Sequence, residues 1–157
     1  MQELNLGSNQ IKHFKKLMGF PRLKELNLDY NPITNIEGSA LRDCSDLTSL
    51  SINHIKLPNY HGDLRFLRQG TKLENLSMTG CFTEKDLADF ATFPDLFNMK
   101  RFIMRSVGLI RTKDIHFKMP VLETLDLRDN RVFEVESIDD LSNFTSLVEV
   151  NFANNPL

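Results

Sequence analysis

The feature that most constrains this chain is a pattern of eleven positions that recurs along its whole length. The stretch from 122 to 132 shows it best, with an aliphatic residue at positions 1, 4, 6 and 11 and asparagine at position 9. Seven copies begin, in order, at Met1, Leu23, Leu47, Leu73, Met99, Leu122 and Leu147. Their starts lie 22 to 26 residues apart. Repeats of this length predict a solenoid in which each copy forms one coil.

Positions 4 to 6 of each copy are predicted to form a short strand. Successive side chains of a strand point to opposite faces, so the apolar residues at positions 4 and 6 face inward and the residues between them face outward. A single strand of this kind cannot bury its apolar side, whereas stacked copies form a parallel sheet over one continuous core. The sequence therefore predicts an α/β solenoid.

Position 9 is expected to turn the chain away from the sheet. A buried asparagine amide there can bond the loop backbone of its own and neighbouring repeats, which would otherwise lack partners. Four repeats place asparagine at this position, namely Asn9, Asn31, Asn130 and Asn155. Repeats three to five carry Ile55, Cys81 and Val107 instead. Cysteine tolerates burial, but isoleucine and valine cannot make these bonds, so we expect rearranged or wetter loops after the middle strands.

The segments that return to the next strand carry apolar residues at three-residue spacing, which suits short helices or 3-10 turns on the convex side. Thr83–Asp86 and Ser137–Asp140 each resemble a capping box that opens a helix. His116 interrupts the apolar stripe, and we expect Ile115 or Phe117 to take its inward place.

These residues resemble the leucine-rich-repeat superfamily, and the resemblance implies a horseshoe arc with a concave parallel sheet. The closest class is the intracellular short-repeat class, typified by phosphatase-one regulators and by ciliary and cytoskeletal scaffolds. Repeat one carries the resemblance best, with Ile11, Phe14, Leu17 and Phe20 in three-residue steps. The resemblance implies a protein–protein interaction scaffold. Repeats longer than 22 residues favour an alternative, a ligand-recognition fragment of an extracellular Toll-like receptor ectodomain.

Composition and motifs narrow the function classes further. The net charge of −2 provides no field of one sign, so neither nucleic acid nor membrane insertion is expected. The sequence contains no phosphate-binding glycine loop and no metalloprotease or nucleophile-elbow motif. The four histidines share no spacing that would gather them around a metal. We therefore predict a protein that is not an enzyme, uses no cofactor or small-molecule substrate, and binds another protein.

The two cysteines bear on the compartment. Cys44 and Cys81 fall about two repeats apart, roughly 10 Å at the strand spacing, too far for a disulfide. Free thiols favour a cytoplasmic protein, and the family resemblance adds a ciliary or cytoskeletal setting. The extracellular alternative draws on glycosylation sequons at Asn75 and Asn143. Residues 1–157 form one array of six repeats and the start of a seventh, and without polar caps we expect an excerpt of a longer protein.

Positions 3, 5, 7 and 8 are expected to project from the concave face into solvent. They gather acids and a tyrosine in the first two repeats, small neutral residues in the middle, and arginines in repeats five and six. Arginine and tyrosine are enriched at binding hot spots, and the mixed charge favours a protein partner. The candidate contact surface consists of Tyr30, His54, Arg101, Ile103, Arg105 and Arg128. The alternative is that these residues are merely solvated, with Arg128 paired to Asp126 or Asp129.

Overall fold

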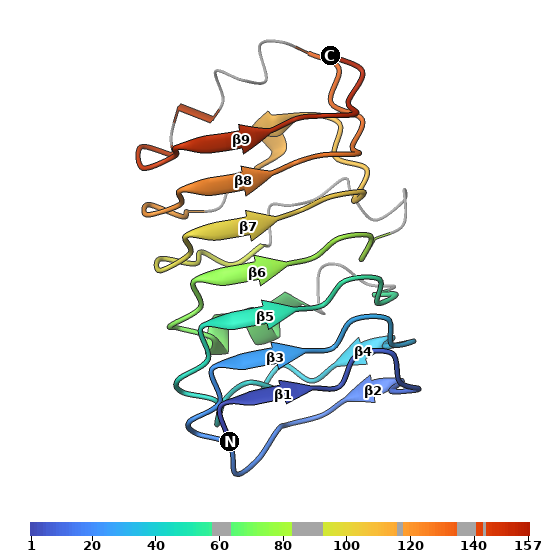
Figure 1. Cartoon of the computed structure of the whole chain (residues 1–157), viewed down its shortest axis with the longest axis vertical. Helices are drawn as coiled ribbons and strands as arrows, with labels where there is room; N and C mark the ends of the chain where they lie inside the picture. The colour runs from blue at the N-terminus through green and yellow to red at the C-terminus, as the bar shows by residue number, and fades with distance from the viewer. Residues whose placement is uncertain (58–63, 83–92, 116–117, 135–140, 143) are drawn as a thin grey trace.

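The computed structural model describes residues 1–57, 64–82, 93–115, 118–134, 141–142 and 144–157. Seven coils stack along one axis, and each contributes one strand to the same side of the molecule (Figure 1). The strands are β1 (Glu3–Asn5), β3 (Glu25–Asn27), β5 (Ser49–Ser51), β6 (Asn75–Ser77), β7 (Arg101–Ile103), β8 (Thr124–Asp126) and β9 (Glu149–Asn151). The predicted solenoid is thus confirmed, with strands that cover positions 3 to 5 of each repeat.

All six strand pairs are parallel and pair equal positions of consecutive repeats. Leu26 on β3 lies opposite Leu4 on β1 and Leu50 on β5, and Leu125 on β8 lies opposite Phe102 and Val150. A shift of one residue in any repeat would have turned its leucines outward. The register expected from the eleven-position pattern is therefore correct in all seven repeats.

The core lies directly behind the sheet. Positions 1, 4 and 6 of repeats two to six are buried, and they are filled by Leu23, Leu26, Leu28, Leu47, Leu50, Ile52, Leu73, Leu76, Met78, Met99, Phe102, Met104, Leu122, Leu125 and Leu127. The corresponding residues of the outermost strands, such as Leu4 and Val150, are only partly buried. Each coil is thus covered by its two neighbours, which is how a solenoid builds its core.

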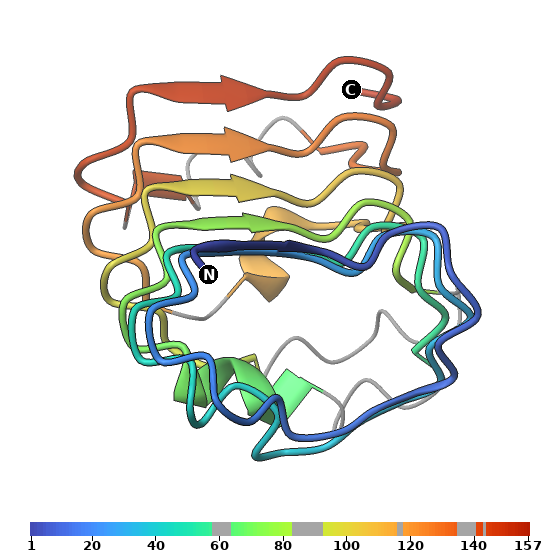
Figure 2. The ribbon, with the colours of Figure 1, turned by 60° about the horizontal axis from the view of Figure 1, so that its bottom comes forward.

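The opposite side of the coils is less regular. In the first two repeats the short strands β2 (His13–Phe14) and β4 (Asn35–Ile36) form a parallel pair. Further along, the 3-10 helices η1 (Leu64–Gln69) and η3 (Thr112–Asp114) lie across the coil from the sheet (Figure 2). These 3-10 helices confirm the expected 3-10 turns, whereas the first two repeats cross this side in extended form.

Two predictions for the return segments concern residues that are not described. Both capping boxes, at Thr83–Asp86 and Ser137–Asp140, lie outside the described residues, as do His116 and Phe117. Ile115 is described and is buried, which fits the inward place expected for it.

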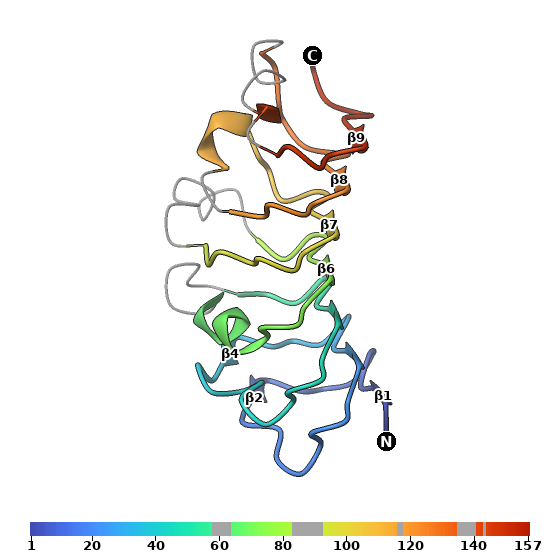
Figure 3. The ribbon, with the colours of Figure 1, turned by 90° about the vertical axis from the view of Figure 1, so that its left-hand side faces the viewer.

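Viewed along the strands, β1 and β9 stand further out than β6, so the outer face of the sheet is concave (Figure 3).

Candidate functional site

The turn that follows each strand has the same backbone conformation in all seven repeats. The residue at position 8 has a φ between 49° and 62° throughout, and these residues are Ser8, Tyr30, His54, Gly80, Ser106, Asp129 and Asn154. Residues other than glycine rarely adopt this left-handed backbone conformation. Three of the seven belong to the repeats without asparagine at position 9. The left-handed residue is thus kept in those repeats, and the expectation of rearranged or wetter loops beyond it stays a prediction.

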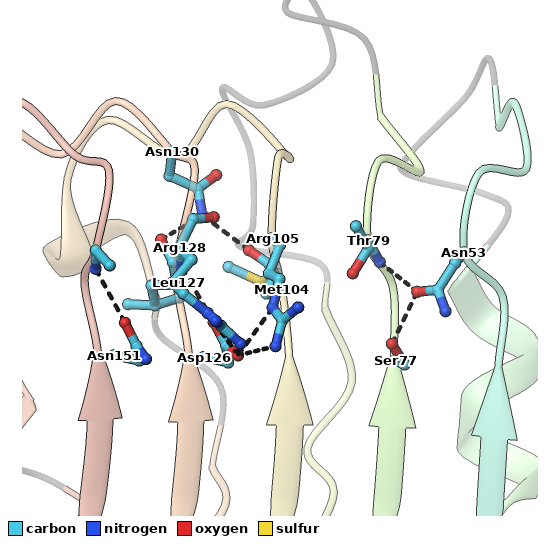
Figure 4. Close-up of polar contacts among 11 residues, drawn as sticks. Asn53, Ser77, Thr79, Met104, Arg105, Asp126, Leu127, Arg128, Asn130 and Asn151 are labelled. Carbon is cyan, nitrogen blue, oxygen red and sulfur yellow. Dashed lines mark hydrogen bonds and ion pairs between the residues drawn. The ribbon is translucent and has the colours of Figure 1, made fainter.

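The asparagines at position 9 bond the loops as predicted. The Asn130 Nδ2 group donates to the carbonyl oxygens of Met104 and Leu127, both at 2.8 Å, and to that of Arg128 at 3.2 Å. Its Oδ1 accepts from the backbone N–H groups of Val107 and Leu109 at 3.0 and 3.1 Å. The side chain of Val107 has no polar group, so Asn130 of the next repeat supplies partners for the loop of repeat five. Figure 4 shows Asn130 beside Met104 of repeat five.

Cys81 takes over part of the asparagine role in repeat four. Its thiol donates to the Ile52 carbonyl oxygen at 2.6 Å, which is a bond to position 6 of the preceding repeat. Asn31 and Asn130 make the same type of bond, to Leu6 and Met104. Burial raises the pKa of the Cys81 thiol far above its usual range, so the sulfur stays protonated and can donate. The thiols of Cys44 and Cys81 are both free and buried, as the sequence predicted.

A second set of side chains holds the turns from the concave face. In four repeats the side chain at position 5 accepts a hydrogen bond from the backbone N–H two residues further on. These side chains belong to Asn5, Asn27, Asp126 and Asn151, and the distances run from 2.8 to 3.2 Å. Such local bonds are typical of asparagine and aspartate in turns.

Repeats three and four have serine at position 5, which is too short for this bond, and the preceding repeat supplies it. Asp29 Oδ1 accepts from the Asn53 backbone N–H and from the Ser51 hydroxyl, both at 2.7 Å. Asn53 Oδ1 in turn accepts from the Thr79 backbone N–H at 2.7 Å and from the Ser77 hydroxyl at 2.8 Å (Figure 4). A polar ladder therefore crosses the concave face from β3 to β6.

The arginines of the candidate surface do not all point freely into solvent. Arg105 donates from Nε and Nη2 to Asp126 Oδ2 at 2.8 and 2.6 Å. Arg128 donates from Nη2 to the same oxygen at 2.8 Å (Figure 4). Asp126, expected in solvent, is buried beneath the two guanidinium groups, with 8% of its side chain exposed. The alternative expected Arg128 to pair with Asp126 or Asp129 across neighbouring strands. Arg128 does pair with Asp126, but within one repeat, and Arg101 is exposed.

The aromatic members of the candidate surface lie against each other. The rings of Tyr30 and His54 are stacked, with centroids 4.6 Å apart and planes 19° apart. Tyr30 keeps 60% of its surface exposed. A Cβ atom on Gly80 would come within 2.8 Å of His54 Nδ1, so glycine at that turn leaves room for the imidazole ring. The side chains at position 8 of repeats two and three thus form a small aromatic ledge, which we define as Tyr30 and His54.

The structure divides the six candidate residues into two groups. The aromatic ledge follows β3 and β5, and the arginines and half-buried Ile103 follow or lie on β7 and β8. Repeat four, with small polar side chains, separates the groups. The sequence did not single out Asp29, Asn53 or Asp126 as the residues that hold this surface. The sequence did contain a signal. Each repeat with serine at position 5 follows a repeat with Asp or Asn at position 7.

The family comparison agrees with this geometry. A family model, described as Leucine Rich Repeat, matches residues 22–44, which span repeat two almost completely. Together with the seven parallel strands, the match supports membership of the leucine-rich-repeat superfamily. The comparison with curated proteins gave no match.

Within the part of the chain that the structure describes, no three side chains of His, Cys, Asp or Glu gather so that they could hold a metal ion. No helix among the same residues has the length and apolar character needed to cross a membrane.

Proposed function

We propose that this chain is a protein–protein interaction scaffold that binds its partner on the concave face of the sheet. Leucine-rich repeats generally mediate protein–protein interaction, and solenoids of this type typically serve as non-enzymatic scaffolds. The aromatic ledge is the observation that supports the proposal most. A large aromatic side chain that is exposed, yet held by stacking, loses little freedom when a partner covers it.

The backbone strengthens this argument. Tyr30 has a φ of 54°, and a bulky residue in the left-handed region is a conformational outlier that costs about 1–2 kcal/mol. Glycine or asparagine would suit the turn better. All seven repeats have this conformation at position 8, so it is a property of the array. At Tyr30 it places a large aromatic ring at the rim of the concave face, although a smaller residue would suit the turn better.

The arginine group contributes differently. Arg105 and Arg128 are held by Asp126 and are about one-third exposed, so they offer oriented donors at low entropic cost. Arg101 makes no ion pair within the described residues and supplies a mobile charge. The proposed contact surface therefore keeps all six residues, with Arg101 and Tyr30 as its main contacts.

The compartment and the subclass form part of the proposal. Two buried free thiols support a reducing compartment, hence an intracellular short-repeat scaffold in the cytoplasm, in a ciliary or cytoskeletal setting. The Toll-like extracellular alternative requires sugar on Asn75 or Asn143. Asn75 lies on β6 in the middle of the concave face, so a glycan there would cover the proposed surface. A glycan mass shift at Asn75 would therefore overturn the scaffold proposal.

Site-specific photo-crosslinking tests the surface. A benzophenone side chain replaces Tyr30 in one sample and Phe97 in another, because Phe97 is equally exposed, at 59%, but lies off the sheet. We expect the partner protein to be crosslinked to position 30 and hardly at all to position 97. In the variant with the crosslinker at position 30, Arg101→Glu should lower the yield of crosslinked partner. Equal capture from both positions, or none from position 30, would contradict the proposal.

A further inference from the structure

Two acids of the first two repeats, Glu3 and Glu25, lie side by side on the concave face. Glu3 and Glu25 occupy directly paired positions on β1 and β3, and both are exposed. Neither forms an ion pair with any other residue that the structure describes. Like charges in directly paired positions repel each other. This end of the concave face therefore favours a cation from outside the array.

The surface is hollowed at the same place. A shallow cavity of about 260 Å³ spans β1, β3 and β5. Its polar lining consists of Glu3, Asn5, Glu25, Asn27, Ser49 and Ser51. Amide and hydroxyl groups beside two carboxylates can accept hydrogen bonds from an ammonium or guanidinium group. The shape and the charge of the hollow thus fit a basic side chain.

The charge reverses further along the sheet. Arg101 on β7 has neutral neighbours on both sides, Asn75 and Thr124. Arg105, on the same repeat, keeps about one-third of its side chain exposed although it binds Asp126. Apart from Asp126, the acids at the outward positions 3, 5, 7 and 8 of repeats five to seven are Asp129 and Glu149. They belong to repeats six and seven, on the far side of Arg101 from β6. Repeat five therefore presents positive charge toward the middle of the face.

The floor between the two ends is neutral. The hydroxyl groups of Ser51 and Ser77 carry no charge that would select a partner, and both already donate to the polar ladder. Three strand steps separate β3 from β7, which is about 14 Å at the usual strand spacing. In an extended segment, residues i and i+4 lie about 13 Å apart and point to the same side.

We propose that the concave face docks an extended protein segment that carries a basic and an acidic side chain four residues apart. The basic side chain enters the hollow beside Glu3 and Glu25, and the acidic one binds Arg101 and Arg105. The segment runs across the strands, over the small side chains of β5 and β6. This inference rests on the proposed function and specifies the chemistry of the partner.

Two synthetic peptides of identical composition test the spacing. The first, acetyl-Gly-Lys-Ser-Thr-Ser-Glu-Gly-amide, has its charges four residues apart, and the second, acetyl-Gly-Ser-Thr-Lys-Glu-Ser-Gly-amide, has them adjacent. Titration into isotope-labelled chain at about 20 mM salt limits screening. We expect the first peptide to shift amide signals of both β3 and β7 and to bind about tenfold more tightly than the second.

Charge exchange separates this inference from simple loss of folding. Glu3→Lys with Glu25→Lys, or Arg101→Glu alone, should each weaken the first peptide about tenfold. The combined variant should regain part of the affinity, because the peptide can then lie in the reverse direction. Equal binding of the two peptides, or no recovery, would overturn the inference. If neither peptide binds while the crosslink at position 30 persists, this inference fails and the proposed function stands.

Discussion

Repeat six and repeat four solve the same structural problem in different ways. Repeat six supplies its own bonds, since Asp126 caps its turn and Asn130 fixes its loop. Repeat four, with Ser77 and Cys81 at the same positions, receives its cap from Asn53 of repeat three. The two turns nevertheless have the same left-handed conformation. The coil geometry thus belongs to the array, because neighbours supply what a single repeat lacks.

This dependence is strongest in repeat five. Its positions 5 and 9 are Ile103 and Val107, neither of which can hold the turn, and its loop backbone is bonded by Asn130 of repeat six. A substitution in one repeat should therefore lower the stability of the neighbouring repeat as well as that of its own repeat. A set of substitutions can measure how far each repeat depends on its neighbours.

The largest effect is expected for Asn130→Leu. This substitution keeps the branched shape and the number of side-chain heavy atoms but removes five hydrogen bonds in a buried setting. Each buried group left without a partner costs about 1–3 kcal/mol. We expect the free energy of unfolding to fall by about 4 kcal/mol or more in urea titrations. Ile55→Leu, at the same position of repeat three, should cost less than about 1.5 kcal/mol. Equal costs would show that the amide network is not what stabilises repeats five and six.

A smaller effect is expected for Asp29→Ala. Its carboxylate accepts from the Asn53 backbone N–H, the Asn53 side chain and the Ser51 hydroxyl, all in repeat three. We expect a loss of about 1–2 kcal/mol and faster hydrogen exchange at the Asn53 amide. Asn27→Ala, which removes a bond within repeat two, should instead expose the Asp29 amide. If both variants accelerated hydrogen exchange at the same amides, the capping of repeat three by Asp29 of repeat two would be disproved.

The third prediction uses the cysteine of repeat four. Burial raises the pKa of the Cys81 thiol in the folded chain, so folding favours the protonated form. This contribution is fully present below the unfolded pKa of about 8.5 and is lost as the pH rises above it. We expect the free energy of unfolding to fall by about 1 kcal/mol from pH 8 to pH 9.5 because of Cys81.

Burial raises the pKa of Cys44 as well, so the control is a comparison of variants. Cys81→Ala should remove part of the alkaline loss, and Cys44→Ala should remove another part. No change in the pH profile of Cys81→Ala would show that the thiol is more accessible than the structure indicates. Repeat six, with Asn130 at position 9 and no cysteine, should show no such dependence in local hydrogen exchange.

The parts of this molecule that the sequence predicted are those that repeat. The strand register, the buried leucines and the asparagine bonds follow from one pattern, because each position has the same surroundings in every coil. The caps that one repeat supplies to the next depend on pairs of residues such as Asp29 and Ser51, which are 22 positions apart and occupy positions 7 and 5 of their repeats. Asp126 was likewise expected in solvent, because its burial requires arginines from two repeats.

The smallest effect on stability, and the sharpest one on function, is expected for Tyr30→Asn. Asparagine adopts the left-handed conformation more readily than tyrosine, which offsets the loss of a stacking contact worth about 0.5–1.5 kcal/mol. We therefore expect the free energy of unfolding to change by less than about 1 kcal/mol, while binding of the partner captured at position 30 falls. Asn154, the asparagine already present at this position in repeat seven, shows that the turn accepts the substitution. If stability rose and binding stayed the same, Tyr30 would be a strained residue without a role in the contact surface.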